Sequence, residues 1–401
     1  MPDLPSLHLA AALDAAGWHP AAWRTQSARA DELFTAQYWV DLVNEAERGL
    51  LDFITIDDSL KMQSSKWGVP DDRIGQVRGR LDALLIAARI APTTAHIGIV
   101  PVGTTTHTEP FHLSKAVATL DYVSAGRAGL QVRVSATRVE AEQFGRRNFP
   151  SLRLGEHEED PIAQQIIIDL FDEAANYVEV LRRLWDSWDD DAEIRDVPTG
   201  RFIDRDKLHY IDFEGPWFRV RGPSITPRPP QGQPLVMALA HASVPYRLAG
   251  RSADAVFVTP RDSSDLRRIE SEVRAEEAAV GRGTEPLRIF ADLVVFIDDE
   301  PGAASARKDR LDRLDGRAYR SDAFVFTGTP AELVDQLLEW NSDEIAGFRL
   351  RPGVQPYDLE MIVRRVVPLL QDRGVFRRHY DEGTLRSRLG LERPTNRYAV
   401  A

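Results

Sequence analysis

The sequence predicts a (β/α)8 barrel of the TIM type, with insertions, that spans residues 1–401 as one domain. Eight short apolar segments alternate with helical patterns along the chain, which is the order of elements in such a barrel. In the clearest unit, residues 96–135, a strand, a polar loop, a helix, a glycine-marked turn and a second strand follow one another. Two strands joined by a helix pair in parallel. No GxGxxG or GxxxxGK[ST] motif follows any strand, so a doubly wound sheet is less favoured.

The first half of the chain supplies four strands and three helices. Short apolar runs predict strands at residues 7–13, 51–56, 97–102 and 130–135. Apolar residues at helical spacing predict helices at residues 31–49, 81–90 and 110–122. The third helix begins at Pro110, a residue favoured in a first helical turn. Residues 61–80 show neither period and are expected to form a long loop over the carboxyl ends of the strands.

The second half continues the alternation and adds insertions. Strands are expected at residues 235–239, 255–258, 287–296 and 347–351, and helices at 163–188, 245–250, 265–280, 329–340 and 359–370. Charged stretches punctuated by glycine and proline predict insertions near residues 138–162, 189–233 and 300–325. The second insertion is expected to hold a hairpin, with strands near 209–213 and 217–220, and the third an exposed helix at 303–314.

The composition is that of a soluble globular protein and argues against several function classes. Hydrophobic residues make up 43% and charged residues 28% of the chain, so a large core is expected. The net charge of -12 argues against binding to nucleic acid or anionic membranes. The absence of cysteine excludes thiolate catalysis, and without HExxH or GxSxG motifs neither a metal site nor a serine nucleophile is expected. No apolar run approaches the roughly 20 residues that span a bilayer, and no signal-like start is present, so a cytoplasmic location is expected.

Polar residues gather where the second and third strands end. Asp58 follows the second strand, and a run of threonines with His107 and Glu109 follows the third. The carboxyl ends of barrel strands carry the chemistry in this fold class. A carboxylate there can accept a hydrogen bond from a heterocyclic ligand, and the hydroxyls and imidazole can hold a ligand ring and a proton. The alternative is local, with Asp58 and Thr108 capping the segments that follow them.

Arg133 alternates with apolar residues along the fourth strand and shares one face with Gln131 and Ser135. If that face looks into the barrel, the guanidinium needs an anion, such as Asp58, Glu109, a phosphate or a substrate carboxylate. If it looks outward, Arg133 pairs with an acidic residue of a helix. The strand pattern alone leaves both arrangements open.

Several longer stretches resemble one known family, the bacterial luciferase-like flavin-dependent monooxygenases, in particular the nitrilotriacetate monooxygenase component A branch. The stretches run in the family's order over nearly the whole chain and include AERGLLDFITIDDS (46–59), TAHIGIVPVGTTTHTEPFHL (94–113), LDYVSAGRAGLQVRVS (120–135) and FTGTPAELVDQLLEW (326–340).

The resemblance implies a luciferase-like barrel that receives reduced FMN from a separate NAD(P)H:flavin reductase and uses it with O2 to oxygenate a small organic substrate. It also implies a homodimer or homotetramer. Positions that match the family's motifs, together with the polar residues at the strand ends, supply the candidate site. The candidates are Asp58, Thr104, Thr105, Ser135, His241 and Ser243 for cofactor binding, and His107 and Arg133 for catalysis.

Two parts of the family's phosphate site are changed in this chain. The Gly-Ser-x-x-Gly loop after the fifth strand corresponds to AHASVP (240–245). A His-x-x-x-Tyr motif falls on Ile167 and Phe171 if the helix is aligned without a gap, and His157 can replace that histidine only if an insertion separates it from the helix. Glycine lets backbone N–H groups approach a phosphate closely. A working flavin site therefore requires a rebuilt phosphate contact, for which His241, Ser243 and Arg133 are the candidates. Two alternatives stay open: an F420-dependent oxidoreductase, and a barrel that has lost FMN binding and acts as a binding or partner protein.

Overall fold

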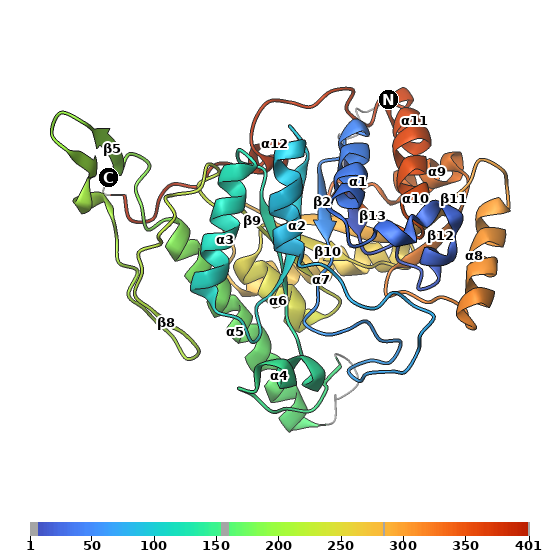
Figure 1. Cartoon of the computed structure of the whole chain (residues 1–401), viewed down its shortest axis with the longest axis horizontal. Helices are drawn as coiled ribbons and strands as arrows, with labels where there is room; N and C mark the ends of the chain where they lie inside the picture. The colour runs from blue at the N-terminus through green and yellow to red at the C-terminus, as the bar shows by residue number, and fades with distance from the viewer. Residues whose placement is uncertain (1–6, 154–159, 284, 400–401) are drawn as a thin grey trace.

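Eight parallel strands close into a barrel in the computed structural model, which describes residues 7–153, 160–283 and 285–399 (Figure 1). In the order in which they pair, the strands are β1 (His8–Leu13), β2 (Phe53–Ile56), β3 (Gly98–Thr104), β4 (Gly129–Arg133), β9 (Leu235–Leu239), β10 (Ala255–Val258), β11 (Arg288–Ile297) and β13 (Ile345–Pro352). The ring closes where β13 pairs with β1, with Gly347 opposite His8. The predicted (β/α)8 barrel is confirmed.

A ninth strand, β12 (Phe324–Gly328), was not expected from the sequence. It pairs with residues 293–297 of β11, on the edge where β10 pairs only with residues 288–291. Because β11 is ten residues long and β10 only four, β10 leaves the second half of that edge without backbone partners. Backbone N–H and C=O groups buried without partners are costly, and β12 supplies the missing bonds.

Helices surround the barrel close to their expected positions. The longer ones are α1 (Ala36–Arg48), α2 (Ala83–Ile90), α3 (Pro110–Val123), α5 (Pro161–Trp185), α6 (Ser243–Ser252), α7 (Ser263–Ala279), α8 (Ala303–Asp315) and α9 (Pro330–Trp340). The short ones are α4 (Arg138–Phe144), α10 (Tyr357–Met361), α11 (Val367–Asp372) and α12 (Leu385–Arg388), with a π-helical turn at Ile362–Val366. Helix α1 begins five residues later than expected because Thr35 caps it, accepting a hydrogen bond from Tyr38 N.

The barrel interior is layered, with apolar side chains at its amino end and polar ones above them. The lower layer includes Phe53, Val100 and Phe290, and leucines of the C-terminal segment (Leu385, Leu389 and Leu391) close it from below. Two residues further along β2 and β11, Thr55 and Asp292 are also buried. Since residues two apart in a strand share a face, the interior becomes polar toward the carboxyl end.

The predicted insertion at residues 189–233 forms two hairpins that extend away from the barrel (Figure 1). The pair β7 (Phe213–Glu214) and β8 (Arg219–Val220) lies within the expected hairpin, whereas β5 (Glu193–Asp196) and β6 (Arg201–Ile203) were not expected. The other insertions contain α4 and α8, and residues 154–159 of the first lie outside the described residues.

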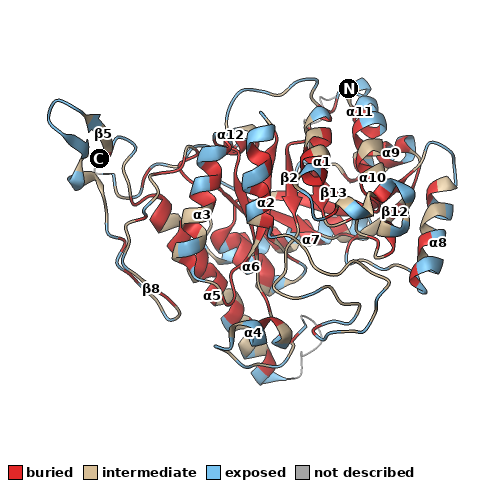
Figure 2. Cartoon of the chain, in the orientation of Figure 1, coloured by how far each residue is buried: buried red, intermediate tan, exposed pale blue. Residues whose placement is uncertain are grey.

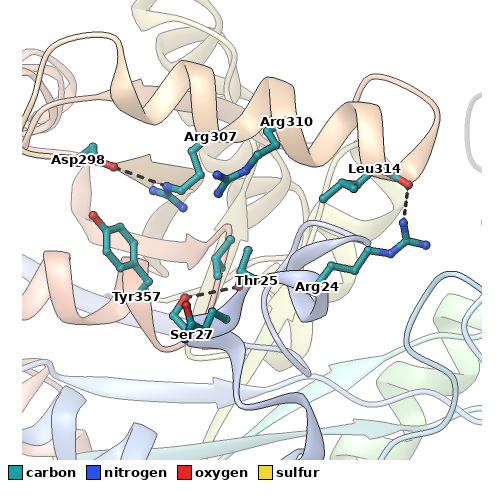
Figure 3. A pocket seen from close by; sticks show the side chains of 10 residues that line it. Arg24, Thr25, Ser27, Asp298, Arg307, Arg310, Leu314 and Tyr357 are labelled. Carbon is teal, nitrogen blue, oxygen red and sulfur yellow. Dashed lines mark hydrogen bonds and ion pairs between the residues drawn. The ribbon is translucent and has the colours of Figure 1, made fainter.

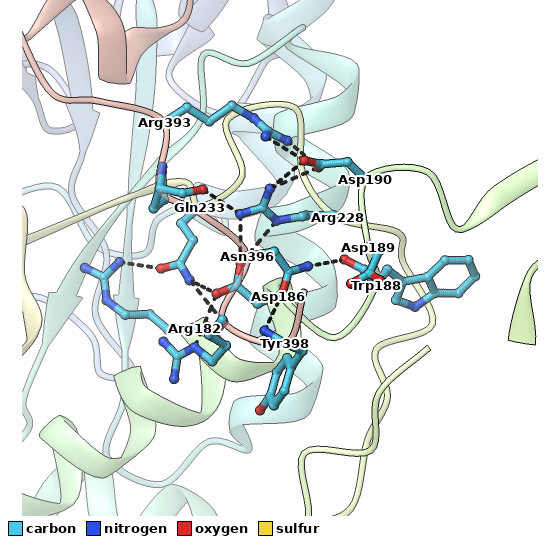
Figure 4. Close-up of polar contacts among 12 residues, drawn as sticks. Arg182, Asp186, Trp188, Asp189, Asp190, Arg228, Gln233, Arg393, Asn396 and Tyr398 are labelled. Carbon is cyan, nitrogen blue, oxygen red and sulfur yellow. Dashed lines mark hydrogen bonds and ion pairs between the residues drawn. The ribbon is translucent and has the colours of Figure 1, made fainter. Parts of the chain in front are cut away.

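Arginines from distant parts of the chain neutralise Asp186 and Asp190, which follow α5 (Figure 4). Arg228 contacts Asp186 and Asp190, and Arg393 of the C-terminal segment also contacts Asp190, at 2.5 Å. Arg393, helped by Arg228, lowers the pKa of Asp190 to about 2. Carboxylates are unfavourable at the C-terminal end of a helix, so these contacts stabilise the end of α5.

The strands and the inner faces of the helices are buried, and exposed residues lie on the outer faces and the hairpins (Figure 2). Within the described ranges, no helix is both long and apolar enough to cross a membrane.

Candidate active site at the barrel mouth

Glu140 of α4 is the centre of a hydrogen-bond network at the carboxyl ends of β2 and β4. Its side chain is fully buried. The donors to its carboxylate are Leu60 N at 3.0 Å, Ser59 Oγ at 2.9 Å, Thr137 Oγ1 at 2.8 Å, Arg133 Nη1 at 3.2 Å and the Ser135 hydroxyl. Burial alone would raise the pKa of Glu140, but Arg133 and the two hydroxyls outweigh it and lower the pKa to about 2. The group is therefore an anion at neutral pH.

Arg133 lies on the inward face of β4, because Gln131 of the same face reaches Arg349 inside the barrel. Its Nη1 donates to Glu140 and, at 3.0 Å, to the carbonyl oxygen of Asp58. The sequence left open whether its anion would be Asp58, Glu109 or a ligand, and the structure supplies Glu140 instead. Glu109 is paired with Arg146 at 2.7 Å.

Asp58 lies at the rim, where its carboxylate joins the end of β2 to the start of α2. Oδ1 accepts from Ser59 N at 2.7 Å and Oδ2 from Ala83 N at 3.0 Å. These hydrogen bonds are the ones expected if Asp58 caps the segments that follow it. Burial raises the pKa of Asp58, against the effect of both backbone hydrogen bonds.

The threonine loop is bound to the end of β4. Thr105 donates to the carbonyl oxygen of Arg133 through its backbone N–H (2.9 Å) and its hydroxyl (3.2 Å). Thr106 Oγ1 accepts from Ser135 N at 3.0 Å. Within the described ranges, the hydroxyl of Thr104 has no hydrogen-bond partner, which leaves it available to a ligand.

His107 is buried against two aromatic rings, one at the end of α4 and one in the segment after it. Its ring stacks on Phe144, with centroids 5.3 Å apart, and on Phe149, at 5.9 Å. Its Nε2 is buried and has no hydrogen-bond partner among the described residues. Burial lowers the pKa of His107, so the ring is neutral at neutral pH. Its φ of 75° lies in the left-handed region that non-glycine residues rarely adopt, a strained conformation of the kind that gathers at functional sites.

Three carboxylates and one guanidinium lie at the carboxyl ends of β1 and β2. Arg80 Nη1 contacts Asp57 at 2.6 Å, and its Nη2 lies 3.7 Å from Asp14. Burial raises the pKa of Asp14 to about 6, with Asp57 and Asp58 adding to the effect and Arg80 opposing it.

A buried ion-pair network forms the floor below the mouth. Arg349 and Arg351 of β13 both contact Asp292 of β11, with Arg349 Nε at 2.8 Å and Arg351 Nε at 3.0 Å. Arg349 also donates to Gln131 Oε1 at 2.6 Å, and Arg351 to Asp322 at 2.7 Å. Burial lowers the pKa of Arg349, whereas Asp292 and Asp322 raise that of Arg351 against its burial. Each charge has a partner, which a barrel interior requires.

A cavity of about 920 Å³ lies at the carboxyl ends of β9 and β10. The polar residues that line it include His241, Thr259, Arg261, Arg268, Arg320 and Asp322. His241 Nδ1 lies 2.9 Å from Thr259 Oγ1, and partial desolvation by the surrounding protein lowers the pKa of this half-exposed ring. Of the eight candidate residues, His241 is the one in this lining. Ser243 points away from the cavity and donates to Glu276 of α7 at 2.6 Å.

The sequence analysis missed Glu140, the arginines of the cavity and the buried network. A signal existed for the network, because Asp292 is a carboxylate in the middle of an otherwise apolar stretch of β11. Arg349 and Arg351 are two residues apart and therefore share a face. No comparable signal marks Glu140, since it lies in an insertion whose position over the mouth depends on tertiary contacts.

Comparison with known proteins places the chain in a family. Residues 15–322 match the family model described as luciferase-like monooxygenase. The chain is 30% identical to N-acetyl-S-(2-succino)cysteine monooxygenase of Bacillus subtilis (strain 168) and to nitrilotriacetate monooxygenase component A of Aminobacter aminovorans, and each alignment covers 96% of both chains.

Two solved structures share the fold. A long-chain alkane monooxygenase superposes with a TM-score of 0.83 at 22% identity, covering 96% of this chain and 95% of that one. A riboflavin lyase with modified FMN and riboflavin superposes with a TM-score of 0.83 at 24% identity, covering 97% and 96%. The resemblance inferred from the motifs is confirmed, and with it the flavin-dependent monooxygenase class. The chain belongs to the luciferase-like monooxygenase family.

Proposed function

We propose that this protein receives reduced FMN from a separate NAD(P)H:flavin reductase and uses it with O2 to oxygenate a small organic substrate at the barrel mouth. The observation that carries the proposal is the cavity of about 920 Å³ at the carboxyl ends of β9 and β10, whose lining holds four arginines and three aspartates. Cofactor pockets commonly measure about 300–1,000 Å³. The two relatives named above are monooxygenases, and the riboflavin lyase of the same fold holds a modified FMN.

Arginines fit the phosphate group of FMN in place of the missing glycine loop. Arg261 and Arg320 line the cavity, and within the described ranges neither side chain forms an ion pair with a carboxylate. Guanidinium groups bind phosphate through paired, charge-assisted hydrogen bonds. A loop without glycine therefore does not by itself remove the phosphate site, because these side chains can supply the donors.

Six of the candidates surround the mouth, where the flavin ring and the substrate would lie, and Ser243 is not among them. When bound, the reduced flavin supplies the electrons that activate O2. We assign Asp58, Thr104, Thr105 and Ser135 to the surroundings of the ring, and the free hydroxyl of Thr104 is the donor among them that no protein group uses. Neutral His107 can accept a proton at Nε2, and Arg133, held by Glu140, can donate its remaining N–H groups to an anionic group.

Oxygen chemistry on a flavin requires that water be kept from the reacting atoms, and the segments held over the mouth would serve this purpose. Helix α4 is held over it by Glu140, and the loop after β2 is held by the same carboxylate through Ser59 and Leu60. A homodimer or homotetramer, a cytoplasmic location and the reductase partner remain predictions.

Flavin titration tests the proposal, and riboflavin, which lacks the phosphate, isolates the phosphate contact. We expect the protein to bind reduced FMN more tightly than reduced riboflavin under anaerobic conditions. Arg320→Gln should weaken FMN binding by about tenfold or more, the effect of losing a charged hydrogen bond, and leave riboflavin binding unchanged. Arg313→Gln, an exposed arginine of α8 outside the cavity lining, is the matched control.

Equal affinities for FMN and riboflavin would refute the phosphate assignment. Binding of F420 in place of FMN would support a deazaflavin oxidoreductase. A protein that binds none of these flavins would have lost the cofactor.

A further inference from the structure

Lys61 lies at the start of the long loop between β2 and α2, on the part of that loop that Arg133 contacts. Arg133 Nη1 donates to the carbonyl oxygen of Asp58 at 3.0 Å. Glu140 Oε1 accepts both from Arg133 Nη1, at 3.2 Å, and from Leu60 N, at 3.0 Å. Lys61 is the next residue along the chain. The backbone that carries Lys61 is therefore held against the guanidinium of Arg133.

The ammonium group of Lys61 is half-buried and has no carboxylate partner. Within the described ranges it forms no ion pair and no hydrogen bond, and it contacts Trp67, whose ring centroid lies 5.1 Å from Nζ. Burial lowers the pKa of Lys61, Glu140 opposes this effect, and Arg133 and Arg80 add to it. Two cations and one carboxylate thus act on Lys61, and Arg133 already binds that carboxylate.

The aspartates that follow β1 and β2 do not supply the missing partner. Asp57 is paired with Arg80 at 2.6 Å, and the carboxylate of Asp58 accepts from two backbone N–H groups. Asp14 lies 3.7 Å from Arg80, and burial raises its pKa to about 6. Lys61 is therefore left as a cation that the protein does not balance, and a half-buried charge without a counterion is unfavourable.

The loop that carries Lys61 also reaches the edge of the cavity at the mouth. The carbonyl oxygen of Gly68 accepts from Ser151 Oγ at 2.9 Å, which ties this loop to the segment after α4. Half-exposed Trp67 precedes Gly68, and Arg153, which lines the cavity, lies 5.7 Å from the same ring. The Trp67 ring therefore connects Lys61 to the site proposed for the flavin.

A cavity of about 740 Å³ beside α8 also carries arginines, but they turn apart (Figure 3). Arg24 donates to the carbonyl oxygen of Leu314 at 2.9 Å, near the end of α8, whereas Arg307 lies 3.7 Å from Asp298. An unbalanced cation next to a second cation on an adjoining segment is thus a feature of the mouth and not of this outer cavity.

Lys61 and Arg133 together have the donors that a carboxylate requires. Arg133 uses only Nη1 for its contacts with described residues, and its side chain is 26% exposed, which leaves its other N–H groups accessible. A guanidinium and an ammonium bind the oxygens of a carboxylate through charge-assisted hydrogen bonds. Such a ligand would also supply the charge that Lys61 lacks.

We propose that the substrate oxygenated at this mouth carries a carboxylate group, which Lys61 and Arg133 bind at the ends of β2 and β4. The inference rests on the proposed function, in which the phosphate of FMN lies at the ends of β9 and β10. Lys61 then determines specificity, because it favours an anionic substrate over a neutral one of the same shape.

Isothermal titration calorimetry under anaerobic conditions, with and without saturating reduced FMN, tests this site with two pairs of probes, benzoate with benzamide and succinate with succinamide. Each amide has nearly the shape of its acid without the charge. We expect at least one acid to bind the protein saturated with FMN, and its amide to bind at least about tenfold more weakly, because the charged hydrogen bonds are lost.

Substitutions identify the cation. Lys61→Gln should weaken binding of that acid by about tenfold, and Lys61→Arg, which keeps the charge, should weaken it much less. Lys66→Gln is the matched control, because Lys66 is an exposed lysine of the same loop, and it should change the affinity less than about twofold.

Failure of this inference differs from failure of the proposed function. If reduced FMN binds but neither acid binds at millimolar concentration, or if each amide binds as tightly as its acid, the carboxylate site is overturned and the flavin assignment stands. Equal losses in Lys61→Gln and Lys66→Gln overturn it as well. Weaker binding of FMN but not of riboflavin in Lys61→Gln would assign Lys61 to the flavin phosphate instead. If no flavin binds, the proposed function fails and this inference fails with it.

Discussion

Replacing Glu140 by glutamine tests the network that holds α4 and the loop after β2 over the barrel mouth. The pKa of Glu140 is lowered from 4.5 to about 2 in the folded protein. One pKa unit corresponds to about 1.36 kcal/mol, so the ionised carboxylate contributes about 3 kcal/mol to the free energy of unfolding at neutral pH. The side chain is fully buried, and solvent does not screen this contribution.

The expected change in melting temperature follows from the length of the chain. Unfolding entropy is about 2.1 cal/mol/K per residue, which for a chain of this length is about 0.8 kcal/mol/K. A loss of about 3 kcal/mol should therefore lower the Tm of Glu140→Gln by about 3–4 °C in scanning calorimetry at pH 7. Glu142→Gln is the control, because Glu142 is an exposed residue of α4 paired only with exposed Arg138.

The stabilisation that Glu140 provides should depend on pH in one direction. A carboxylate with a lowered pKa stabilises the folded state above the pKa of the unfolded state, and this contribution disappears as the pH falls from about 4.5 toward 2. The difference in Tm between wild type and Glu140→Gln should stay constant above about pH 5 and shrink below it. A variant that melts with the Glu142→Gln control, or a difference that persists unchanged to low pH, would refute the assignment of Glu140 as the centre of the network.

Two further substitutions probe the barrel. Asp14 has its pKa raised to about 6 by burial, so its ionisation opposes folding as the pH rises through 6. Asp14→Asn should therefore gain Tm relative to wild type as the pH rises from about 4 to about 6 and keep that gain at higher pH, and a relative loss over that range would contradict the burial effect. Gly347→Ala should cost more than about 4 kcal/mol or prevent folding, because the added Cβ overlaps the backbone carbonyl oxygen of His8 where the barrel closes. Gly283→Ala, with nothing within 4 Å, is the control, and equal urea midpoints for the two variants would contradict the closure of β13 on β1.

Local sequence patterns were sufficient for most of the fold. Each of the eight barrel strands was expected within a few residues of its observed place, because a strand buried on both faces is a short apolar run. Helix α9 was equally readable, since Thr329 and Glu332 form a capping box around Pro330. Strand β12 could not be predicted from a local pattern. It pairs with the part of β11 that β10 leaves unpaired, and how much is left unpaired depends on the lengths of β10 and β11.

For the candidate site too, some features could be predicted from the sequence and others only from the tertiary structure. The sequence by itself determined that polar residues such as Asp58 and the threonine loop follow β2 and β3, because strand order and parallel pairing place those ends together. It did not determine their partners. Arg133 meets Glu140 only because α4 folds back over β4, and Arg349 meets Asp292 only because β13 and β11 are neighbours in the closed ring. Such contacts join residues far apart in the chain or across a turn, and their energy depends on burial, which a local pattern does not encode.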